Sequence, residues 1–147
     1  MKILALDVGD KTIGVAVSDE LFLTAQGITT IERVGIRKDT TKILDLVREH
    51  NVGTIVIGLP LKMDGQDSIQ TEKVREFRTM LENKLRSCGL QNVELVYQDE
   101  RFTTVIAEKV LIEADVSRAK RKTVIDKQAA VVILQSYLDR NYSCTMV

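Results

Sequence analysis

Short apolar runs separated by turn-forming residues open the chain and predict three consecutive strands. Residues 3–8 and 13–17 are mostly apolar and flank the turn-like segment 9–12, so they predict a β-hairpin. A third strand is predicted for residues 27–32, where isoleucines stand among threonines, which favour strands. The chain is therefore expected to begin with a three-stranded meander.

From about Asp39 the apolar period lengthens to that of a helix. The predicted helix ends at Asn51 and Gly53, and its apolar stripe consists of Ile43, Leu44 and Val47. Residues 54–58 form an uninterrupted apolar run ended by Pro60, which is typical of a strand buried on both faces. Such a strand predicts parallel packing inside a sheet.

The second half of the chain alternates helices and strands. Ser68 is a suitable cap for a long helix whose apolar residues recur every three or four positions until Gly89. The remaining predicted elements are a strand at 93–97, a helix capped by Thr103 or Thr104, and a last helix at 124–139. The order β-β-β-α-β-α-β-α-α predicts the α/β class: a mixed five-stranded sheet with helices on both faces, in one domain over 1–147. No Gly-x-Gly-x-x-Gly follows the first strand, which argues against a dinucleotide-binding domain.

The composition is that of an ordinary globular protein, with 147 residues, 44% hydrophobic and 29% charged. The first apolar run meets Asp7 too early to be a signal peptide or a membrane helix, so a cytoplasmic location is expected. The two cysteines, Cys88 and Cys144, are widely separated and lack the paired spacing of a zinc site. We expect both to be free thiols.

Two aspartates stand inside apolar patterns. Asp7 lies within the most apolar predicted strand, where an unpartnered carboxylate would cost several kcal/mol, so a metal ion is a better explanation than a turn-capping role beside Gly9. Asp126 falls on the core-facing stripe of the last helix, which continues through Ala129, Ala130, Ile133 and Tyr137. The alternative for Asp126 is a first-turn acid favoured by the helix dipole.

A third acid is available directly after the strand at 93–97. Strand alternation puts Asp99 on the face of Leu95 and Tyr97 and Glu100 on the opposite face, although an error of one residue in the boundary would reverse this. The sequence leaves open which of the two acids faces the site. A surface ion pair with Arg101 is the alternative role.

Carboxylates from three separate segments predict a divalent-metal site. Grouped carboxylates repel one another unless a cation binds among them, and Mg²⁺ or Mn²⁺ prefers such oxygen ligands. A pair of these ions can activate a water and stabilise the leaving oxygen of a phosphodiester, with no need for a histidine base. The only histidine, His50, stands at a helix end, which makes a Ser-His-Asp or Cys-His mechanism a poor explanation.

The charge balance at first argues against a nucleic-acid partner, because 21 acids offset 21 Lys and Arg residues. Basic residues are nevertheless concentrated before Asp126. The candidate substrate-binding residues are Lys11, Arg101, Arg118, Lys120, Arg121 and Lys122. Either Lys11 contacts a phosphate or it decorates a hairpin, and the cluster at 118–122 is either a solvated loop or a nucleic-acid contact.

Four motifs in order resemble the YqgF family of pre-16S ribosomal RNA nucleases, also called Holliday junction resolvase-like proteins. They are Asp7-Val8-Gly9-Asp10-Lys11-Thr12-Ile13-Gly14-Val15-Ala16; Gly58-Leu59-Pro60-Leu61 with Met63-Asp64-Gly65; Asp99-Glu100-Arg101-Phe102-Thr103-Thr104; and Asp126-Lys127-Gln128-Ala129-Ala130 with Ile133-Leu134-Gln135. The resemblance implies a ribonuclease-H-like fold and a role at the 5′ end of small-subunit ribosomal RNA. It also implies Asp7, Glu100 and Asp126 as catalytic metal ligands, with Asp99 as the neighbouring candidate.

The chain departs from the family pattern at three places. Thr12 stands where many members carry Arg, and residues 66–69 replace an acidic-Gly-Pro stretch. The fourth strand ends in Gly58-Leu59-Pro60 without the acid that related resolvases carry there, so the pair at 99–100 must supply it.

The expected function is metal-dependent hydrolysis of structured nucleic acid, with pre-16S ribosomal RNA as the implied substrate and the small ribosomal subunit as a possible partner. A junction resolvase of the same chemistry is the nearest alternative, and it would act as a dimer, whereas the sequence itself leaves monomer or homodimer open. A non-catalytic RNA-binding assembly factor is the non-enzymatic alternative. An actin-like ATPase would need two such domains around its nucleotide, and 147 residues provide one.

Overall fold

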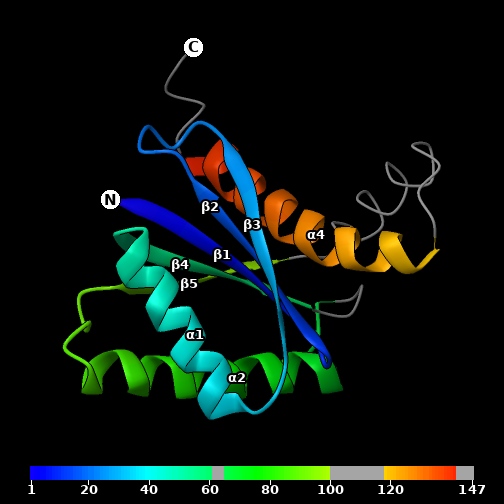
Figure 1. The fold of residues 1–147 in the computed structure, drawn as a ribbon, viewed down its shortest axis with the longest axis horizontal. Coiled ribbons are helices and arrows are strands. Elements are labelled where there is room, and N and C mark those ends of the chain that lie inside the picture. Colours follow the sequence, from blue (N-terminus) through cyan, green and yellow to red (C-terminus); the bar gives the residue numbers. More distant parts are fainter. Residues whose placement is uncertain (61–64, 100–117, 142–147) are drawn as a thin grey trace.

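The computed structural model describes residues 1–60, 65–99 and 118–141, and for residues 118–128 it describes the backbone. The elements in chain order are β1 (Lys2–Val8), β2 (Thr12–Ser18), β3 (Ala25–Glu32), α1 (Ile36–Glu49), β4 (Val52–Leu59), α2 (Ile69–Ser87), β5 (Glu94–Asp99) and α4 (Arg118–Asn141). The strands form one five-stranded sheet in the order β3-β2-β1-β4-β5 (Figure 1). This confirms the predicted mixed α/β sheet.

The sheet combines an antiparallel half with a parallel half. β1 pairs antiparallel with β2, and β2 pairs antiparallel with β3, which confirms the predicted meander. β4 lies parallel to both β1 and β5, as the uninterrupted apolar run predicted. Because β1 lies between β2 and β4, it is a central strand with helices available to cover both of its faces.

Side-chain alternation divides the core into two layers. Along β1, Leu4, Leu6 and Val8 pack in the cluster that includes α1 and α2, whereas Ile3 and Ala5 pack in the cluster that includes α4. The α4 cluster consists of Ile3, Ala5, Ala16, Val56, Ala130, Ile133, Leu134 and Leu138. Figure 1 shows α1 and α2 on one side of the sheet and α4, in orange to red, on the other. Helices on both faces are therefore confirmed.

The helix boundaries agree with the capping signals where such signals exist. Ser68 caps α2, since its hydroxyl accepts the backbone N–H of Thr71, and Gly89 follows the helix with a φ of 77°. α1 begins at Ile36, three residues before the predicted start. The carboxylate of Asp39 accepts the N–H of Val34 from inside the first turn, so Asp39 lies within the helix.

The last helix is longer than predicted. α4 begins at Arg118, whereas the sequence pattern indicated a start at residue 124. The apolar stripe of the sequence begins only near residue 124, but Arg, Lys and Ala are strong helix formers and extend the helix through their intrinsic propensity. The basic segment 118–122, considered as a possible loop, is therefore helical.

Several expectations concern residues outside those described. The predicted helix after Thr103 or Thr104 and the thiol of Cys144 fall there, whereas Cys88 is an exposed free cysteine. Among the helices that the structure describes, none has the length and apolar character needed to cross a lipid bilayer.

Packing of α4 against the sheet generates a stability prediction. Ile133 is fully buried in the α4 cluster, so Ile133→Ala should lower the free energy of unfolding by about 2–5 kcal/mol. Val132→Ala is the matched control on the same helix, since Val132 belongs to neither cluster, and it should cost at most about 1 kcal/mol. Urea unfolding followed by circular dichroism measures both. Equal losses would contradict the observed docking face of α4.

Candidate active site

Asp7 is the one charged residue among the β1 positions that face α4. It follows Ile3 and Ala5 at two-residue intervals, and both of those side chains are buried in the α4 cluster. Asp7 itself is half-buried and stands next to the last residue of its strand. Its carboxylate is therefore placed on the inner side of the α4 layer, close to the carboxyl end of β1.

Glycines flank Asp7 on both neighbouring strands. On β2, Gly14 pairs directly with Asp7. On β4, Ile57 pairs with Leu6, so Gly58 follows at the level of Asp7 in the parallel register. Neither neighbour contributes a side chain to the α4 face, and glycine in a strand commonly marks close approach of a ligand or another backbone. The sheet thus presents the Asp7 carboxylate without side chains on either side of it.

The carboxyl-terminal half of α4 is anchored at the opposite end of β1. Gln135 accepts the backbone N–H of Ala25 at 3.0 Å. Ala25 pairs with Ser18, whose hydroxyl accepts the N–H of Ile3 at 2.8 Å. Gln135 is therefore close to the level at which β1 begins.

Distances along the two elements bring position 126 toward Asp7. Asp126 precedes Gln135 by nine residues, or about 13–14 Å along a helix. Asp7 follows Ile3 by four residues, or about 13 Å along a strand. Figure 1 shows the amino-terminal half of α4 extending toward the carboxyl end of β1. The backbone at position 126 is therefore directed toward the same face and the same end of the sheet as Asp7.

The helix boundary removes one explanation for Asp126. The first turn of α4 contains no acidic residue, because Asp126 is the ninth residue of a helix that begins at Arg118. Interpretation of Asp126 as a first-turn acid stabilised by the helix dipole is wrong, since that effect falls off within one turn. The predicted apolar stripe that follows is observed, with Ala129, Ala130 and Ile133 buried.

The third predicted acid comes from the end of β5. Asp99 pairs with Leu59. Leu59 belongs to the core cluster that includes α1 and α2, here called the α1–α2 cluster, and Tyr97 packs against that cluster. Strand alternation therefore puts Asp99 on the face of Leu95 and Tyr97, as the sequence pattern predicted. This face is opposite to the one that carries Asp7. Glu100 and Arg101 lie outside the described residues.

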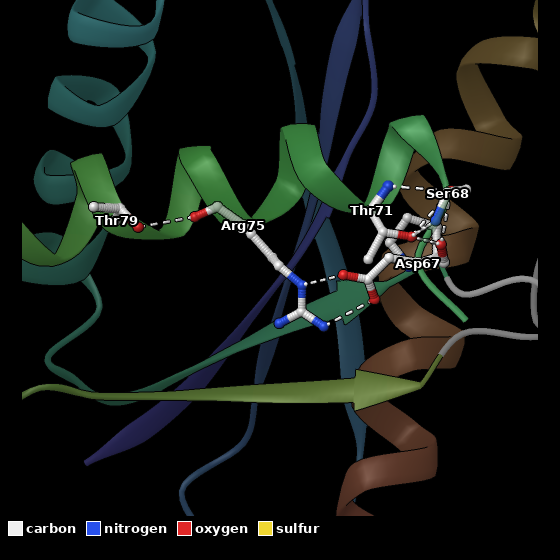
Figure 2. A network of polar contacts seen from close by, with 6 residues as sticks. Asp67, Ser68, Thr71, Arg75 and Thr79 are labelled. Carbon is white, nitrogen blue, oxygen red and sulfur yellow. Dashed lines mark hydrogen bonds and ion pairs between the residues drawn. The ribbon is translucent and has the colours of Figure 1, made fainter. Parts of the chain in front are cut away.

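The exit of β4 beside this site is tied to the start of α2. Both hydroxyls of the capping box, Ser68 Oγ and Thr71 Oγ1, donate to the carbonyl of Pro60. Figure 2 shows this network together with Arg75, whose guanidinium forms two hydrogen bonds of 3.1 Å to Asp67. These contacts fix the carbonyl of Pro60, directly after the end of β4.

The Arg75–Asp67 pair also has an electrostatic consequence. The hydrogen bond to the Asp67 carboxylate raises the pKa of Arg75, and Arg75 and Arg78 both lie over the ring of Tyr97, at 5.4 and 5.1 Å. Both guanidinium groups are thereby held against β5, on the α2 side of the sheet.

The donor set suits a hard divalent ion. Within residues 1–60, 65–99 and 118–141, no group of three His, Cys, Asp or Glu side chains is close enough to hold a metal ion. Of the three predicted ligands, however, only Asp7 has a described side chain. A set made of Asp7, Glu100 and Asp126 would offer carboxylate oxygens alone, which Mg²⁺ and Mn²⁺ prefer and soft metals do not.

Basic residues are found at the predicted positions near this end of the sheet. Lys11 is exposed in the turn that connects β1 to β2, directly after the strand that carries Asp7. Arg118, Lys120, Arg121 and Lys122 occupy the first two turns of α4. Arg118 and Lys122 precede Asp126 by eight and four residues, so the helix period predicts that they share its side of the helix.

Sequence reasoning missed three polar residues that hold the turn after Asp7. Gln70 donates to the carbonyl of Val8 and Arg33 donates to the carbonyl of Gly9. Asp39, which is fully buried, binds the same Arg33 at 3.0 Å. One signal was available: Asp39 stands four residues before Ile43 and is therefore an acid on an apolar helical stripe, which is the criterion that selected Asp126.

Comparison with known sequences supports the motifs. Residues 1–140 match the model of a family described as RuvX: Holliday junction resolvase. A protein of Clostridium tetani named "Putative pre-16S rRNA nuclease" is 50% identical over 143 residues, covering 97% of this chain and 99% of that protein. A protein of the same name from Clostridioides difficile is 51% identical and covers 94% of each chain.

Comparison with solved structures supports the fold. The Thermus thermophilus RuvC chain bound to a Holliday junction superposes with a TM-score of 0.58 at 9% identity, covering 97% of both chains. The fowlpox virus resolvase in complex with junction DNA superposes with a TM-score of 0.59 at 10% identity, covering 97% of this chain and 99% of that one. The predicted ribonuclease-H-like fold, which these resolvases share, is confirmed.

The position of Asp7 generates a binding prediction. Asp7→Asn should weaken Mn²⁺ binding, measured by isothermal titration calorimetry, by at least about tenfold, because loss of a ligand costs at least as much as loss of a supporting residue. Asp10→Asn is the matched control, since Asp10 is an exposed aspartate in the adjacent turn that pairs with Lys73. If the two variants bind Mn²⁺ equally well, Asp7 is not a metal ligand.

Proposed function

This chain belongs to the RuvX family, also called YqgF, and we propose that it is a divalent-metal-dependent endonuclease that processes the 5′ end of pre-16S ribosomal RNA. Its role as a nuclease rests on the family match over residues 1–140. The choice of substrate is supported by relatives of nearly equal length, half identical to this chain, that are named for pre-16S ribosomal RNA. A substrate made in the cytoplasm would place the activity in that compartment.

The observation that carries the proposal is the placement of Asp7. Its carboxylate faces the α4 layer between two glycines, and position 126 of α4 is directed toward the same end of the sheet. The metal ions would be held by Asp7, Glu100 and Asp126. When bound, they would supply an activated water and stabilise the leaving oxygen of the phosphodiester. The three carboxylates would hold and orient these ions.

Glu100 is a better third ligand than Asp99 on the geometry of β5. Asp99 pairs with Leu59 on the α1–α2 face, whereas Asp7 belongs to the α4 face. Continued alternation would return the next residue to the α4 face, where an acid could approach Asp7 across Gly58. The proposal therefore takes Glu100 as the third ligand.

Substrate binding is assigned to the basic residues around this end of the sheet. The proposed phosphate contacts are Lys11, Arg101, Arg118, Lys120, Arg121 and Lys122. A local cluster compensates for the zero net charge, because the phosphates of a bound strand respond to charges within about 10 Å. These contacts would position the backbone of the nucleic acid without reading its sequence.

A junction resolvase is the second candidate, and a specific observation favours it. Two of the resolvase structures that match this fold were solved with Holliday junction DNA. A resolvase would act as a dimer with two symmetric sites. Side-by-side cleavage of a pre-16S 5′-end fragment and a four-way DNA junction separates the candidates, and RNA binding without cleavage under any metal would favour a non-catalytic assembly factor.

The three proposed ligands generate an activity prediction. Asp7→Asn, Glu100→Gln and Asp126→Asn should each lower the cleavage rate in Mg²⁺ by at least about a hundredfold, since each weakens a charge stabilisation of several kcal/mol. Asp99→Asn is the matched control and should retain activity within about threefold, because its face of the sheet is the opposite one. Full activity in both Asp7→Asn and Asp126→Asn would refute the mechanism. Loss in Asp99→Asn with none in Glu100→Gln would exchange their roles.

The basic cluster generates a prediction about salt. Replacement of Arg118 and Lys122 by Gln should weaken substrate binding and reduce the slope of log K against log salt by about one to two, because about one counterion is released per phosphate contact. Lys42→Gln is a suitable control, since Lys42 is an exposed lysine on α1, on the other side of the sheet. Fluorescence anisotropy at several KCl concentrations measures the slope. An unchanged slope would show that Arg118 and Lys122 make no phosphate contact.

A further inference from the structure

Three consecutive residues after Asp7 are each held by a side chain from outside β1 and β2. Gln70 Nε2 donates to the carbonyl oxygen of Val8 at 3.1 Å. Arg33 Nη1 donates to the carbonyl oxygen of Gly9 at 3.0 Å. Lys73 Nζ binds the carboxylate of Asp10 at 3.1 Å. Gln70 and Lys73 stand one turn apart near the start of α2, so one face of this helix end reaches the β1–β2 turn.

Arg33 is itself fixed from several directions. Its Nε donates to Asp39 Oδ2 at 3.0 Å, and its guanidinium lies 5.4 Å from the centre of the Phe77 ring. Asp39 is fully buried, and its second oxygen accepts the N–H of Val34 at 3.1 Å. A guanidinium with an ion-pair partner, an aromatic contact and a carbonyl acceptor has little rotational freedom, so the position of the Gly9 carbonyl is well defined.

These contacts act on the peptide groups next to Asp7. The carbonyl oxygens of Val8 and Gly9 belong to the first two peptide groups after the Asp7–Val8 bond and define the planes of those groups. The N–H of Gly9 donates to the carbonyl oxygen of Thr12 at 2.9 Å, which closes the turn. Lys73 and Asp10 are both more than half exposed, so their ion pair contributes little. Gln70 and Arg33 are therefore the residues that hold the end of β1 from the α2 side, while Asp7 faces α4.

We propose that Gln70 and Arg33 are positioning residues for the metal site: they hold the Val8 and Gly9 carbonyls so that the Asp7 carboxylate is oriented before the ion binds. This inference rests on the proposed function, because it assumes that Asp7 is a ligand. Residues that orient a ligand without touching the ion commonly change metal affinity by about 10- to 100-fold when they are replaced. A purely structural role would change thermal stability and leave the affinity for the ion as it is.

The test measures Mn²⁺ binding by isothermal titration calorimetry in the full chain. Gln70→Leu removes the amide donor at similar volume, and Arg33→Lys keeps the charge opposite Asp39 but offers one ammonium group where two separate donors act. Each variant should weaken Mn²⁺ binding by about tenfold or more. Arg86→Gln is the control, because it removes an ion pair of 2.6 Å to Glu82 at the far end of α2. Its affinity for Mn²⁺ should stay within twofold of the parent.

A second readout uses cleavage at rising Mn²⁺ concentration. If orientation of Asp7 is the defect, high Mn²⁺ should restore the cleavage rate of Gln70→Leu and Arg33→Lys to within about twofold of the parent by mass action. Melting temperatures recorded in EDTA report any change in stability separately. Should Arg33→Lys fail to fold, Gln70→Leu decides the question alone, since Gln70 is half-buried and its loss leaves no buried charge.

The outcomes distinguish this inference from the proposed function. A parent protein that binds no Mn²⁺ refutes the metal site itself. A parent that binds Mn²⁺, with Gln70→Leu and Arg33→Lys binding it equally well, refutes the positioning role and leaves the nuclease assignment standing. A loss of affinity in Arg86→Gln as large as in the two variants also overturns the inference.

Discussion

A carboxylate in the central strand of a sheet covered on both faces is the constraint on which the rest of the structure depends. β1 buries Leu4, Leu6 and Val8 under α1 and α2, so the alternate positions 3, 5 and 7 face α4. Two of those positions are apolar and the third is Asp7. A charge at this place needs compensation, because desolvation of a carboxylate costs several kcal/mol. The glycines beside Asp7, the hydrogen-bonded turn after it and the proposed metal ions each help to accommodate that carboxylate.

Much of the fold follows directly from the sequence. The hairpin, the meander and the parallel β4 were predicted because runs of apolar residues and turn residues specify strands locally. The start of α4 was wrong by six residues, because apolar periodicity reports only the part of a helix that packs on the sheet. Basic residues such as Lys120 extend the helix through intrinsic propensity, which leaves no periodic signal.

The candidate site was less completely predictable. Asp7 and Asp126 were identified because each interrupts an apolar pattern, and the backbone directs both positions toward one face and one end of the sheet. The support for the turn was missed because it depends on contacts distant in sequence: Gln70 bonds to Val8 across 62 residues. Such contacts are set by the packing of α2 against the sheet. No local pattern specifies which carbonyl a glutamine side chain will meet.

The long separation between α4 and the first strands has a consequence during translation. Gln135 binds Ala25 across 110 residues, and the sheet with α1 and α2 is complete in sequence before α4 begins. At about 5–20 residues per second, a ribosome needs roughly 5 to 20 seconds to synthesise that interval. The growing chain thus lacks Asp126, the last of the proposed ligands in the sequence, until α4 is synthesised. A nascent chain without α4 would therefore lack a complete set of the proposed ligands.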